Sequence, residues 1–231
     1  MQRLERVGLL DHTVVIFGSD HGSLMGSHGL EHLPGSSKDR LAGQPWEKRT
    51  PWEESISVPL IVRFPDRFGA GSVSDVLVSP VDIFPTLCGL CGVRVPKTVS
   101  GRDLSDVWTG RSSVAERDAL FCYYVDDANL TPGAEWRGVR TKTWNYFRFL
   151  NGTKGLYDIA EDPLQMHNLF DTRSAVREQM ESTLLSFMDR WNDELKPAPE
   201  YRHWFDEHRQ VVGNVFGALG DPLKAPDWSM L

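Results

Sequence analysis

Residues 13–22, Thr13-Val14-Val15-Ile16-Phe17-Gly18-Ser19-Asp20-His21-Gly22, contain the clearest strand signal in the chain. Residues 13–17 form a continuous run of β-branched and aromatic side chains, which stops at a glycine. A continuous apolar run is typical of a strand that is buried on both faces, as in the sheet of an α/β protein. Residues 58–63, Val-Pro-Leu-Ile-Val-Arg, form a second run of this kind. We therefore expect an α/β domain with a mixed or mostly parallel sheet and flanking helices.

A helix is expected at residues 80–91, where Ser79 and a proline open the segment and Gly92 closes it. Serine is a preferred N-cap, proline fits the first turn, and glycine often follows the last helical residue. Cys88 and Cys91 lie in this helix as C-x-x-C, which invites a redox or zinc interpretation. The second pair of zinc ligands is missing, and the apolar spacing favours two buried thiols instead.

From residue 119 onward the pattern changes to short apolar runs that are separated by turn residues. The runs lie at residues 120–125, 136–141, 144–150 and 155–159. Asn151-Gly152, between the last two runs, is a strong hairpin signal. These runs predict a small antiparallel sheet, and hence an α+β character for this part of the chain.

A long helix is expected at residues 173–195, because apolar residues recur there at three- and four-residue steps. Such a stripe is typical of a helix that faces a core. We expect three divisions of the chain: residues 1–115 as the α/β part, 116–196 as the small subdomain, and 197–231 as a tail. The expected core stripe consists of Val176, Met180, Leu184, Phe187, Met188, Trp191 and Leu195.

Composition excludes several functional classes. The 231 residues carry a net charge of −7 and no recurring Lys/Arg stripe, which argues against a nucleic-acid partner. No stretch reaches the ~20 apolar residues of a membrane span, and the N-terminal residues have no apolar signal-peptide region. The acidic balance repels anions slightly, so any anion site has to be built locally.

The polar residues after the first run are candidates for a site. In open α/β sheets, ligands bind just beyond the carboxyl ends of the strands. Asp20 and His21 could bind one cation there, and Gly22 lets the backbone pass close to a ligand. From these three residues alone, a surface turn is the alternative.

Two further segments carry candidate residues. His28 opens an H-x-x-E-H pattern, which matches the inverted zinc proteases, but Gly29 and Pro34 argue against the helix that such a site needs. Lys48 lies in a charged stretch, residues 46–55, where a cation could neutralise an anionic substrate. A solvated charged loop is the alternative.

Taken together, these segments resemble the type I sulfatases of the alkaline phosphatase superfamily. The resemblance rests on Ser-Asp-His-Gly at residues 19–22, Gly-Ser-His-Gly at 26–29, and Lys-x-x-Pro-Trp-Glu-Glu-Ser-Ile-x-Val-Pro-Leu-Ile-Val-Arg at 48–63. It spans roughly residues 9 to 195, with Asp103 in place of a usual serine. Further matching segments lie at residues 81–87, 95–104, 137–141 and 156–169.

The resemblance implies a sulfuric ester hydrolase, with a partial alkaline-phosphatase-like sheet and a small α+β C-terminal subdomain. It assigns Asp20 and His21 as ligands of a divalent cation, usually Ca²⁺, and Lys48 to a sulfate oxygen. Physical chemistry alone would not have chosen Ca²⁺, because histidine more often marks a transition metal. His28 is assigned to the substrate side of the site. The spacing from Asp20 to Lys48 is longer than usual, so Lys38 is the substitute.

The sequence departs from the family at the nucleophile. Sulfatases use a formylglycine made from the Cys or Ser of a C/S-x-P-x-R motif, and the 231 residues contain no such motif. We expect the nucleophile in a preceding segment, and this chain alone to be inactive and to associate through a bare edge of the first strand. The implied substrate is a sulfate ester, either a small molecule or a sulfated glycan. The alternatives are a phosphomonoester or phosphodiester hydrolase of the same superfamily and a non-catalytic truncated fragment.

Overall fold

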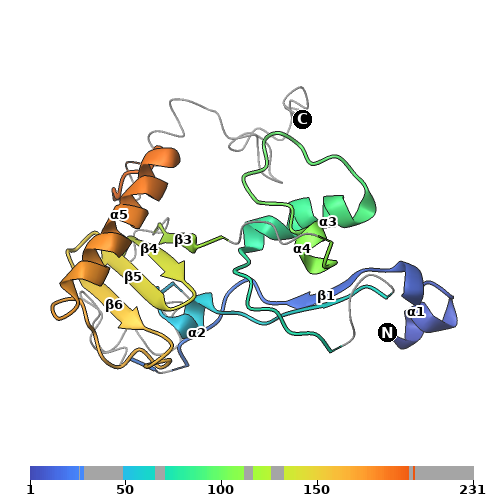
Figure 1. The fold of residues 1–231 in the computed structure, drawn as a ribbon, viewed down its shortest axis with the longest axis horizontal. Helices are drawn as coiled ribbons and strands as arrows, with labels where there is room; N and C mark the ends of the chain where they lie inside the picture. Colours follow the sequence, from blue (N-terminus) through green and yellow to red (C-terminus); the bar gives the residue numbers. More distant parts are fainter. Residues whose placement is uncertain are drawn as a thin grey trace.

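The computed structural model of the protein describes residues 1–25, 27–28, 49–65, 71–111, 117–125, 133–197 and 200. Within those residues the strands form two sheets, one of two strands and one of four (Figure 1). The two sheets lie at opposite ends of the molecule, and the segment around α2 (Glu53–Ile56) connects them. The boundary expected between residues 115 and 116 lies outside the described residues, as does most of the 197–231 tail.

The two-stranded sheet pairs β1 (Val15–Gly18) with β2 (Leu60–Arg63). It follows two short helical segments, α1 (Gln2–Arg6) and η1 (Leu10–His12). Both strands lie where the sequence predicts them, but they run antiparallel, with the Cα partners Phe17 and Ile61 in register. The described strands therefore do not form the mixed or mostly parallel sheet that we expected.

The expectation that the first strand is buried on both faces is wrong for the described structure. Phe17 and Ile61 are 63% and 62% exposed. The apolar side chains of this cross-strand pair therefore stay in contact with solvent.

The helix expected after the second strand is confirmed, together with its end signals. It begins as the single turn η5 (Pro80–Asp82) and continues as α3 (Ile83–Cys91). The N–H of Ser79 donates to Asp82 Oδ2 at 2.8 Å, which fixes the start. Gly92 ends the helix in the left-handed conformation, with φ 68°. Of the two thiols expected to be buried, Cys88 is buried but Cys91 is exposed, because it lies in the last turn.

The carboxylate of Asp82 joins this helix to the two segments that follow it. Asp82 is fully buried and accepts both guanidinium nitrogens of Arg117, at 2.7 and 2.9 Å. It also accepts the N–H of Arg102 at 2.8 Å. A buried carboxylate with this many donors is fully satisfied, and the arrangement fixes the chain just before it enters the second sheet. A short helix, α4 (Ser105–Trp108), packs on α3.

The small antiparallel sheet is confirmed. Its strands are β3 (Ala119–Tyr124), β4 (Trp136–Thr141), β5 (Trp144–Phe149) and β6 (Lys154–Asp158), in that order across the sheet. Every neighbouring pair is antiparallel. Gly152 adopts φ 91° in the turn between β5 and β6, which explains the Asn-Gly signal at this place.

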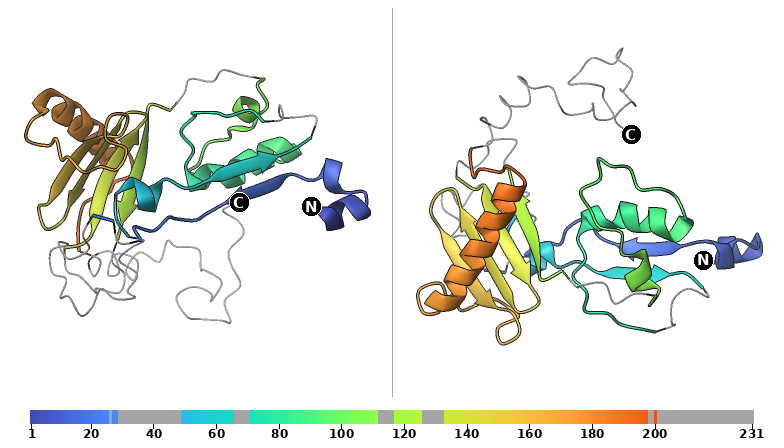
Figure 2. Two further views of the ribbon diagram at one scale, coloured as in Figure 1. Left: turned by 90° about the horizontal axis from the view of Figure 1, so that it is seen from below. Right: turned by 45° about the horizontal axis from the view of Figure 1, so that its top comes forward.

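One face of this sheet is covered by α5 (Ser174–Arg190), as both views in Figure 2 show. The core between them contains Val139, Tyr146 and Leu156 from the strands and Met180, Leu184 and Met188 from the helix. The predicted core stripe is therefore confirmed for the residues inside α5. Trp191 is the exception at 44% exposed, because the helix ends one residue before it. Neither α5 nor any other described helix is long and apolar enough to cross a membrane.

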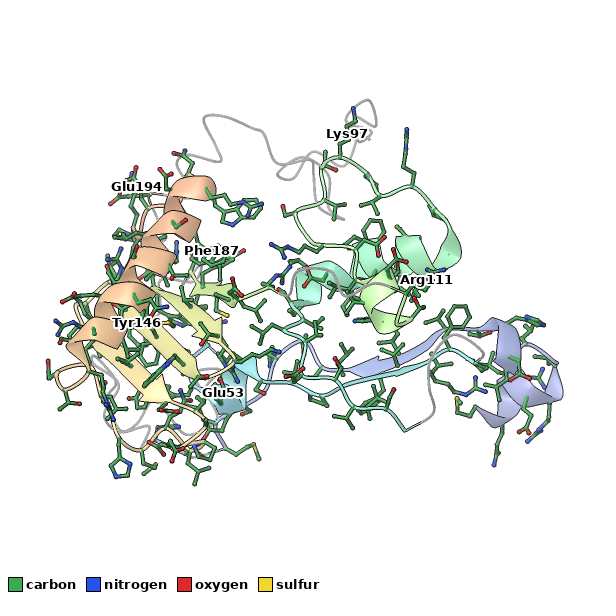
Figure 3. All side chains as sticks on the ribbon, in the orientation of Figure 1. Glu53, Lys97, Arg111, Tyr146, Phe187 and Glu194 are labelled. Carbon is green, nitrogen blue, oxygen red and sulfur yellow. The ribbon has the colours of Figure 1, made fainter. Side chains whose placement is uncertain are left out.

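The opposite face of the sheet is covered by residues 49–56, which we call the bridging segment. Trp52 and Ile56 of this segment pack against Trp136, Phe147, Phe149 and Tyr157 of the sheet. Tyr146 and Glu53 mark the two sides of the sheet in Figure 3, the first toward α5 and the second on α2. Gly155 makes room for this core, since a Cβ there would lie 2.4 Å from the Phe147 ring. The sheet thus buries both faces, and the bridging segment is one of its two covers.

Candidate functional site

Asp20 and His21 lie in the turn that directly follows β1, as the sequence predicts. Asp20 Oδ2 and His21 Nε2 face each other at 3.4 Å. The two side chains are 84% and 40% exposed, so a ligand can reach both from solvent. Adjacent residues converge here because the strand has ended and their side chains no longer alternate between faces.

The hydrogen bond of the His21 ring decides which nitrogen is free for a ligand. His21 Nδ1 lies 2.9 Å from the carbonyl oxygen of Gly22. A carbonyl only accepts hydrogen bonds, so Nδ1 carries the proton and Nε2 of the neutral ring keeps its lone pair. That lone pair faces the Asp20 carboxylate, and two acceptors at this distance repel each other unless a proton or a cation lies between them. A backbone carbonyl on the other ring nitrogen is also the usual orientation of metal-binding histidines.

The state of Asp20 fits the same interpretation. The backbone N–H of His21 donates to Asp20 Oδ1 at 3.0 Å and lowers the pKa of this carboxyl group below its ordinary value. A hydrogen bond from the Ser19 hydroxyl lowers the pKa further. The carboxyl group is therefore ionised at neutral pH, as a metal ligand has to be. In the described part of the chain no group of three His, Cys, Asp or Glu residues could hold a metal, so these residues supply a pair of ligands.

The backbone of the bridging segment contacts this turn directly. The N–H of Gly22 donates to the carbonyl of Ser55 at 2.8 Å. The two backbones are so close that a Cβ on Gly22 would lie 1.9 Å from the carbonyl oxygen of Glu54. Only glycine allows the two backbones to approach this closely. The contact therefore fixes the distance between the Asp20–His21 turn and the bridging segment.

His28 contacts the same segment. Its Nε2 lies 3.2 Å from both carboxylate oxygens of Glu54, and its ring stacks on Trp52 with centroids 4.8 Å apart. The His28 side chain is 9% exposed. A role for His28 on the substrate side stays a prediction, since its observed partners are two residues of the bridging segment.

The two candidate sulfate-binding lysines, Lys48 and Lys38, lie outside the described residues. Arg49, the neighbour of Lys48, is described, and its guanidinium donates to the Tyr124 hydroxyl at 2.7 Å. The chain therefore enters the bridging segment against the four-stranded sheet. Whether Lys48 meets the Asp20–His21 pair stays a prediction.

Sequence reasoning missed the residues that hold the bridging segment. Side chains from the sheet and from the loop after β6 bond to its backbone: Trp136 to the carbonyl of Arg49, Asn145 to that of Pro51, and Gln165 to the N–H of Glu53. The only sequence signal was that Trp136 adjoins one of the family-like segments and that Gln165 lies inside another. Nothing in the pattern indicates what these side chains contact.

Comparison with known proteins identifies the family of the chain. A model of the family described as "N-sulphoglucosamine sulphohydrolase, C-terminal" matches residues 44–190, which include the bridging segment and the whole four-stranded sheet. The chain belongs to the sulfatase family. The resemblance inferred from the sequence motifs is therefore confirmed.

Relatives of this sulfatase-family chain are longer than the chain itself. An ulvan-active sulfatase of Formosa agariphila is 29% identical over 208 residues, which cover 87% of this chain and 37% of the relative. An N-acetylglucosamine-6-O-sulfatase of Bacteroides thetaiotaomicron is 30% identical, over 77% of this chain and 30% of the relative. The chain thus spans about a third of the length of these curated relatives.

Solved structures show the same fold. The structure of BT4656 in complex with its substrate D-glucosamine-2-N,6-O-disulfate matches with a TM-score of 0.70 and 27% identity, over 83% of this chain and 37% of that one. A phosphonate monoester hydrolase of Agrobacterium radiobacter matches with a TM-score of 0.64 and 28% identity, over 82% of this chain and 37% of that one. The expected alkaline-phosphatase-like α/β architecture is therefore confirmed.

Proposed function

We propose that this chain forms the metal-binding and sulfate-binding side of a sulfatase active site that hydrolyses sulfate esters of sugars. The observation that carries the proposal is the convergence of Asp20 Oδ2 and His21 Nε2 at 3.4 Å in the turn after β1. The names of the relatives, which include enzymes of ulvan and of sulfated glucosamine, support a sulfated carbohydrate as the substrate class.

In this proposal Asp20 and His21 are ligands of a divalent cation, Ca²⁺ by family resemblance. The ionised carboxylate supplies the hard oxygen ligand, and the Gly22 carbonyl holds the imidazole in the tautomer that leaves Nε2 free. A bound cation would stabilise negative charge on the sulfate oxygens. Lys48, the residue before the bridging segment, binds a sulfate oxygen, which requires its Nζ to lie within about 10 Å of the metal pair, given metal–oxygen bonds of about 2.3–2.6 Å.

The nucleophile is not part of this proposal. The C/S-x-P-x-R motif that yields formylglycine does not occur in the 231 residues. The residues of this chain bind and orient the ester and compensate its charge, and they do not attack sulfur. The role of residues 1–115 as the C-terminal part of the catalytic domain, with 116–196 as its subdomain, belongs to the same proposal.

Calorimetric titration with Ca²⁺ and then with sulfate tests the assignment. We expect Asp20→Asn and His21→Ala each to weaken Ca²⁺ binding at least tenfold, while Asp106→Asn, an exposed acid in α4, leaves it unchanged. In the presence of Ca²⁺, Lys48→Gln should weaken sulfate binding and Lys38→Gln should not. A Ca²⁺ affinity that neither Asp20→Asn nor His21→Ala changes would refute the metal assignment. Weaker sulfate binding in Lys38→Gln but not in Lys48→Gln would assign the sulfate contact to Lys38.

A second candidate is a hydrolase of phosphonate or phosphate monoesters, which the match to the Agrobacterium radiobacter enzyme favours. Both activities place a tetrahedral oxyanion on the same cation. Competition between sulfate and phosphate on the Ca²⁺-loaded chain separates them at the level of binding. Tighter binding of phosphate than of sulfate would favour this candidate.

A further inference from the structure

The backbone of the bridging segment is held by side chains from β4, from β5 and from the loop after β6. Trp136 Nε1 of β4 donates to the Arg49 carbonyl at 2.8 Å, and Asn145 Nδ2 of β5 donates to the Pro51 carbonyl at 2.8 Å. Gln165 Oε1, from the loop after β6, accepts the N–H of Glu53 at 2.7 Å. The three bonds contact residues 49, 51 and 53, so they fix the path of the main chain over its whole entry into α2.

The three side chains that make these bonds are almost fully buried. Asn145 and Gln165 are each 2% exposed, and Trp136 is 3% exposed. Burial of an amide is unfavourable unless it is hydrogen-bonded, and an apolar side chain would fill the same space without this requirement. Gln165 also adopts φ 52°, which is uncommon for a residue other than glycine. The Glu53 N–H satisfies Gln165 Oε1, whereas Gln165 Nε2 is buried with no hydrogen-bond partner among the described residues. An amide with this cost is not explained by packing alone, and its bond to the bridging segment is a reason for its presence.

The bridging segment in turn contacts the residues of the candidate site. At its C-terminal end the carbonyl of Ser55 accepts the N–H of Gly22, next to His21. Glu54 bonds to His28, which returns to the segment by stacking on Trp52. At its N-terminal end Arg49 follows Lys48 directly in the chain. The segment thus lies between the sheet on one side and the Asp20–His21 turn on the other, and it is continuous with Lys48.

We propose that Gln165, together with Asn145 and Trp136, is a positioning residue of the site: it sets the main chain of the bridging segment and, through the Gly22–Ser55 contact, the place of the Asp20–His21 pair. The mechanical link rests on the observed contacts, and its consequence for metal binding rests on the proposed function. The C-terminal sheet then does more than form its own core. Its side chains also position the candidate site, although the sheet contributes no metal ligand.

Hydrogen exchange of backbone amides tests the mechanical link directly. We compare the full chain with Gln165→Met, which keeps the size but loses the acceptor, and Gln165→Glu, which keeps an acceptor oxygen. Asn168→Ala is the matched control, because Asn168 lies in the same loop but bonds to β6 and to Phe170. In Gln165→Met the amides of Glu53 and Gly22 should exchange about tenfold faster, as expected for the loss of one buried hydrogen bond. The amides of β4 and β5 should keep their wild-type rates.

The outcomes separate positioning from general stabilisation. Glutamate at position 165 should restore the slow exchange of Gly22, and Asn168→Ala should leave Gly22 unaffected at an equal loss of global stability. Wild-type exchange of Gly22 in Gln165→Met would overturn the proposal. An equal acceleration in Asn168→Ala would overturn it as well, because the effect would then be global. Should Gln165→Met fail to fold, the same comparison is made with Asn145→Ala.

Ca²⁺ titration of the same variants measures whether the loss of the Gln165 hydrogen bond changes metal binding at the site. Gln165→Met should weaken Ca²⁺ binding about threefold to tenfold, and Gln165→Glu should restore it. Faster exchange of Gly22 with an unchanged Ca²⁺ affinity would overturn the claim that the link positions the metal pair. If the wild-type chain does not bind Ca²⁺, the proposed metal assignment fails, while the exchange experiment still decides whether Gln165 positions the turn.

Discussion

The N–H of Gly22 donates to the carbonyl of Ser55 at 2.8 Å, which joins the turn after β1 to the segment before β2. This contact exists because residue 22 has no side chain: a Cβ would lie 1.9 Å from the Glu54 carbonyl oxygen and 2.9 Å from its carbonyl carbon. Both atoms belong to the backbone, so neither can move aside without shifting α2. A shift of the turn therefore requires a shift of the bridging segment as long as this contact is kept.

Replacing Gly22 tests this coupling. Gly22→Ala should push the turn away from α2, accelerate exchange of the Ser57 amide, which bonds to Glu53, and abolish the Ca²⁺ binding assigned to Asp20 and His21. Gly152→Ala is the control, because it has a left-handed φ of 91° but no atom within 4 Å of an added Cβ. It should cost about 1 kcal/mol of stability and leave Ca²⁺ binding unchanged. Wild-type Ca²⁺ affinity in Gly22→Ala would contradict the coupling.

The buried pair of Asp82 and Arg117 predicts a large loss of stability on mutation. Asp82→Ala leaves the guanidinium of Arg117 and the N–H groups of Ser79 and Arg102 without their acceptor. Breaking one partner out of such a buried pair costs about 3–5 kcal/mol. Urea unfolding followed by tryptophan fluorescence measures this as a lower midpoint.

The control for Asp82 is a pair of the same residue types on the surface. Asp106 and Arg111 contact each other at 3.0 Å with side chains 59% and 53% exposed. Asp106→Ala should cost at most about 1 kcal/mol, because exposed ion pairs are screened by water and salt. Equal effects of the two mutations would show that Asp82 does not fix the structure as its contacts indicate.

The three cysteines should differ in reactivity. Burial raises the pKa of the Cys122 thiol to about 12, so at pH 8 only about one molecule in ten thousand carries the reactive thiolate there. Cys91 is exposed and Cys88 is buried. Titration with a thiol reagent at pH 8 should therefore label Cys91 first, and label Cys88 and Cys122 only after unfolding. Labelling of Cys122 in the folded chain at the rate of Cys91 would contradict the burial of its thiol.

Sequence reasoning succeeded where local chemistry decides the structure. Ser79, Gly92 and Gly152 each act within a few residues of their own position, and the structure places a helix start, a helix end and a hairpin turn there. The α5 stripe was predictable for a similar reason, since its period belongs to one helix. It failed at Trp191 because the helix ends before this residue, and ends are the least predictable part of an element.

The contacts that build the candidate site were not predictable from the sequence. Gln165 bonds to Glu53 across 112 positions, and no periodicity links the two. The exposure of Phe17 and Ile61 was also missed, because an apolar run indicates what a strand can bury and not what packs on it in this chain. The ligand role of Asp20 and His21 came from the family resemblance and stays a prediction, whereas the hydrogen bond that leaves His21 Nε2 free required coordinates.

The chain on its own should hydrolyse no aryl sulfate. Its residues supply ligands and charge compensation in the proposed site, and no C/S-x-P-x-R motif is present to yield the formylglycine that attacks sulfur. The measurement is release of nitrophenol from 4-nitrophenyl sulfate, with Asp20→Asn as the control for contaminating enzymes. Turnover that Asp20→Asn removes would show that this chain carries a nucleophile of its own.

The two sheets differ in how completely they are covered. The four-stranded sheet buries one face under α5 and the other under the bridging segment. In the β1–β2 pair Phe17 and Ile61 are cross-strand neighbours that remain about two-thirds exposed, and no other strand pairs with β1 in the described part of the chain. Amides of β1 should therefore exchange much faster than those of Leu184 to Trp191, since exposed strands open at low free energy.

The same exposed pair should make the chain associate with itself at high concentration, because apolar residues beside an open strand edge favour pairing with another chain. Ile61→Lys should reduce this association in sedimentation velocity, as an edge lysine opposes pairing. Val73→Lys is the control, because Val73 is 97% exposed and lies outside both strands. A stable monomer with β1 amides as protected as those of α5 would mean that the coverage of a sheet does not set its stability in this protein. Equal effects of the two lysines would mean that net charge, and not the β1–β2 pair, controls association.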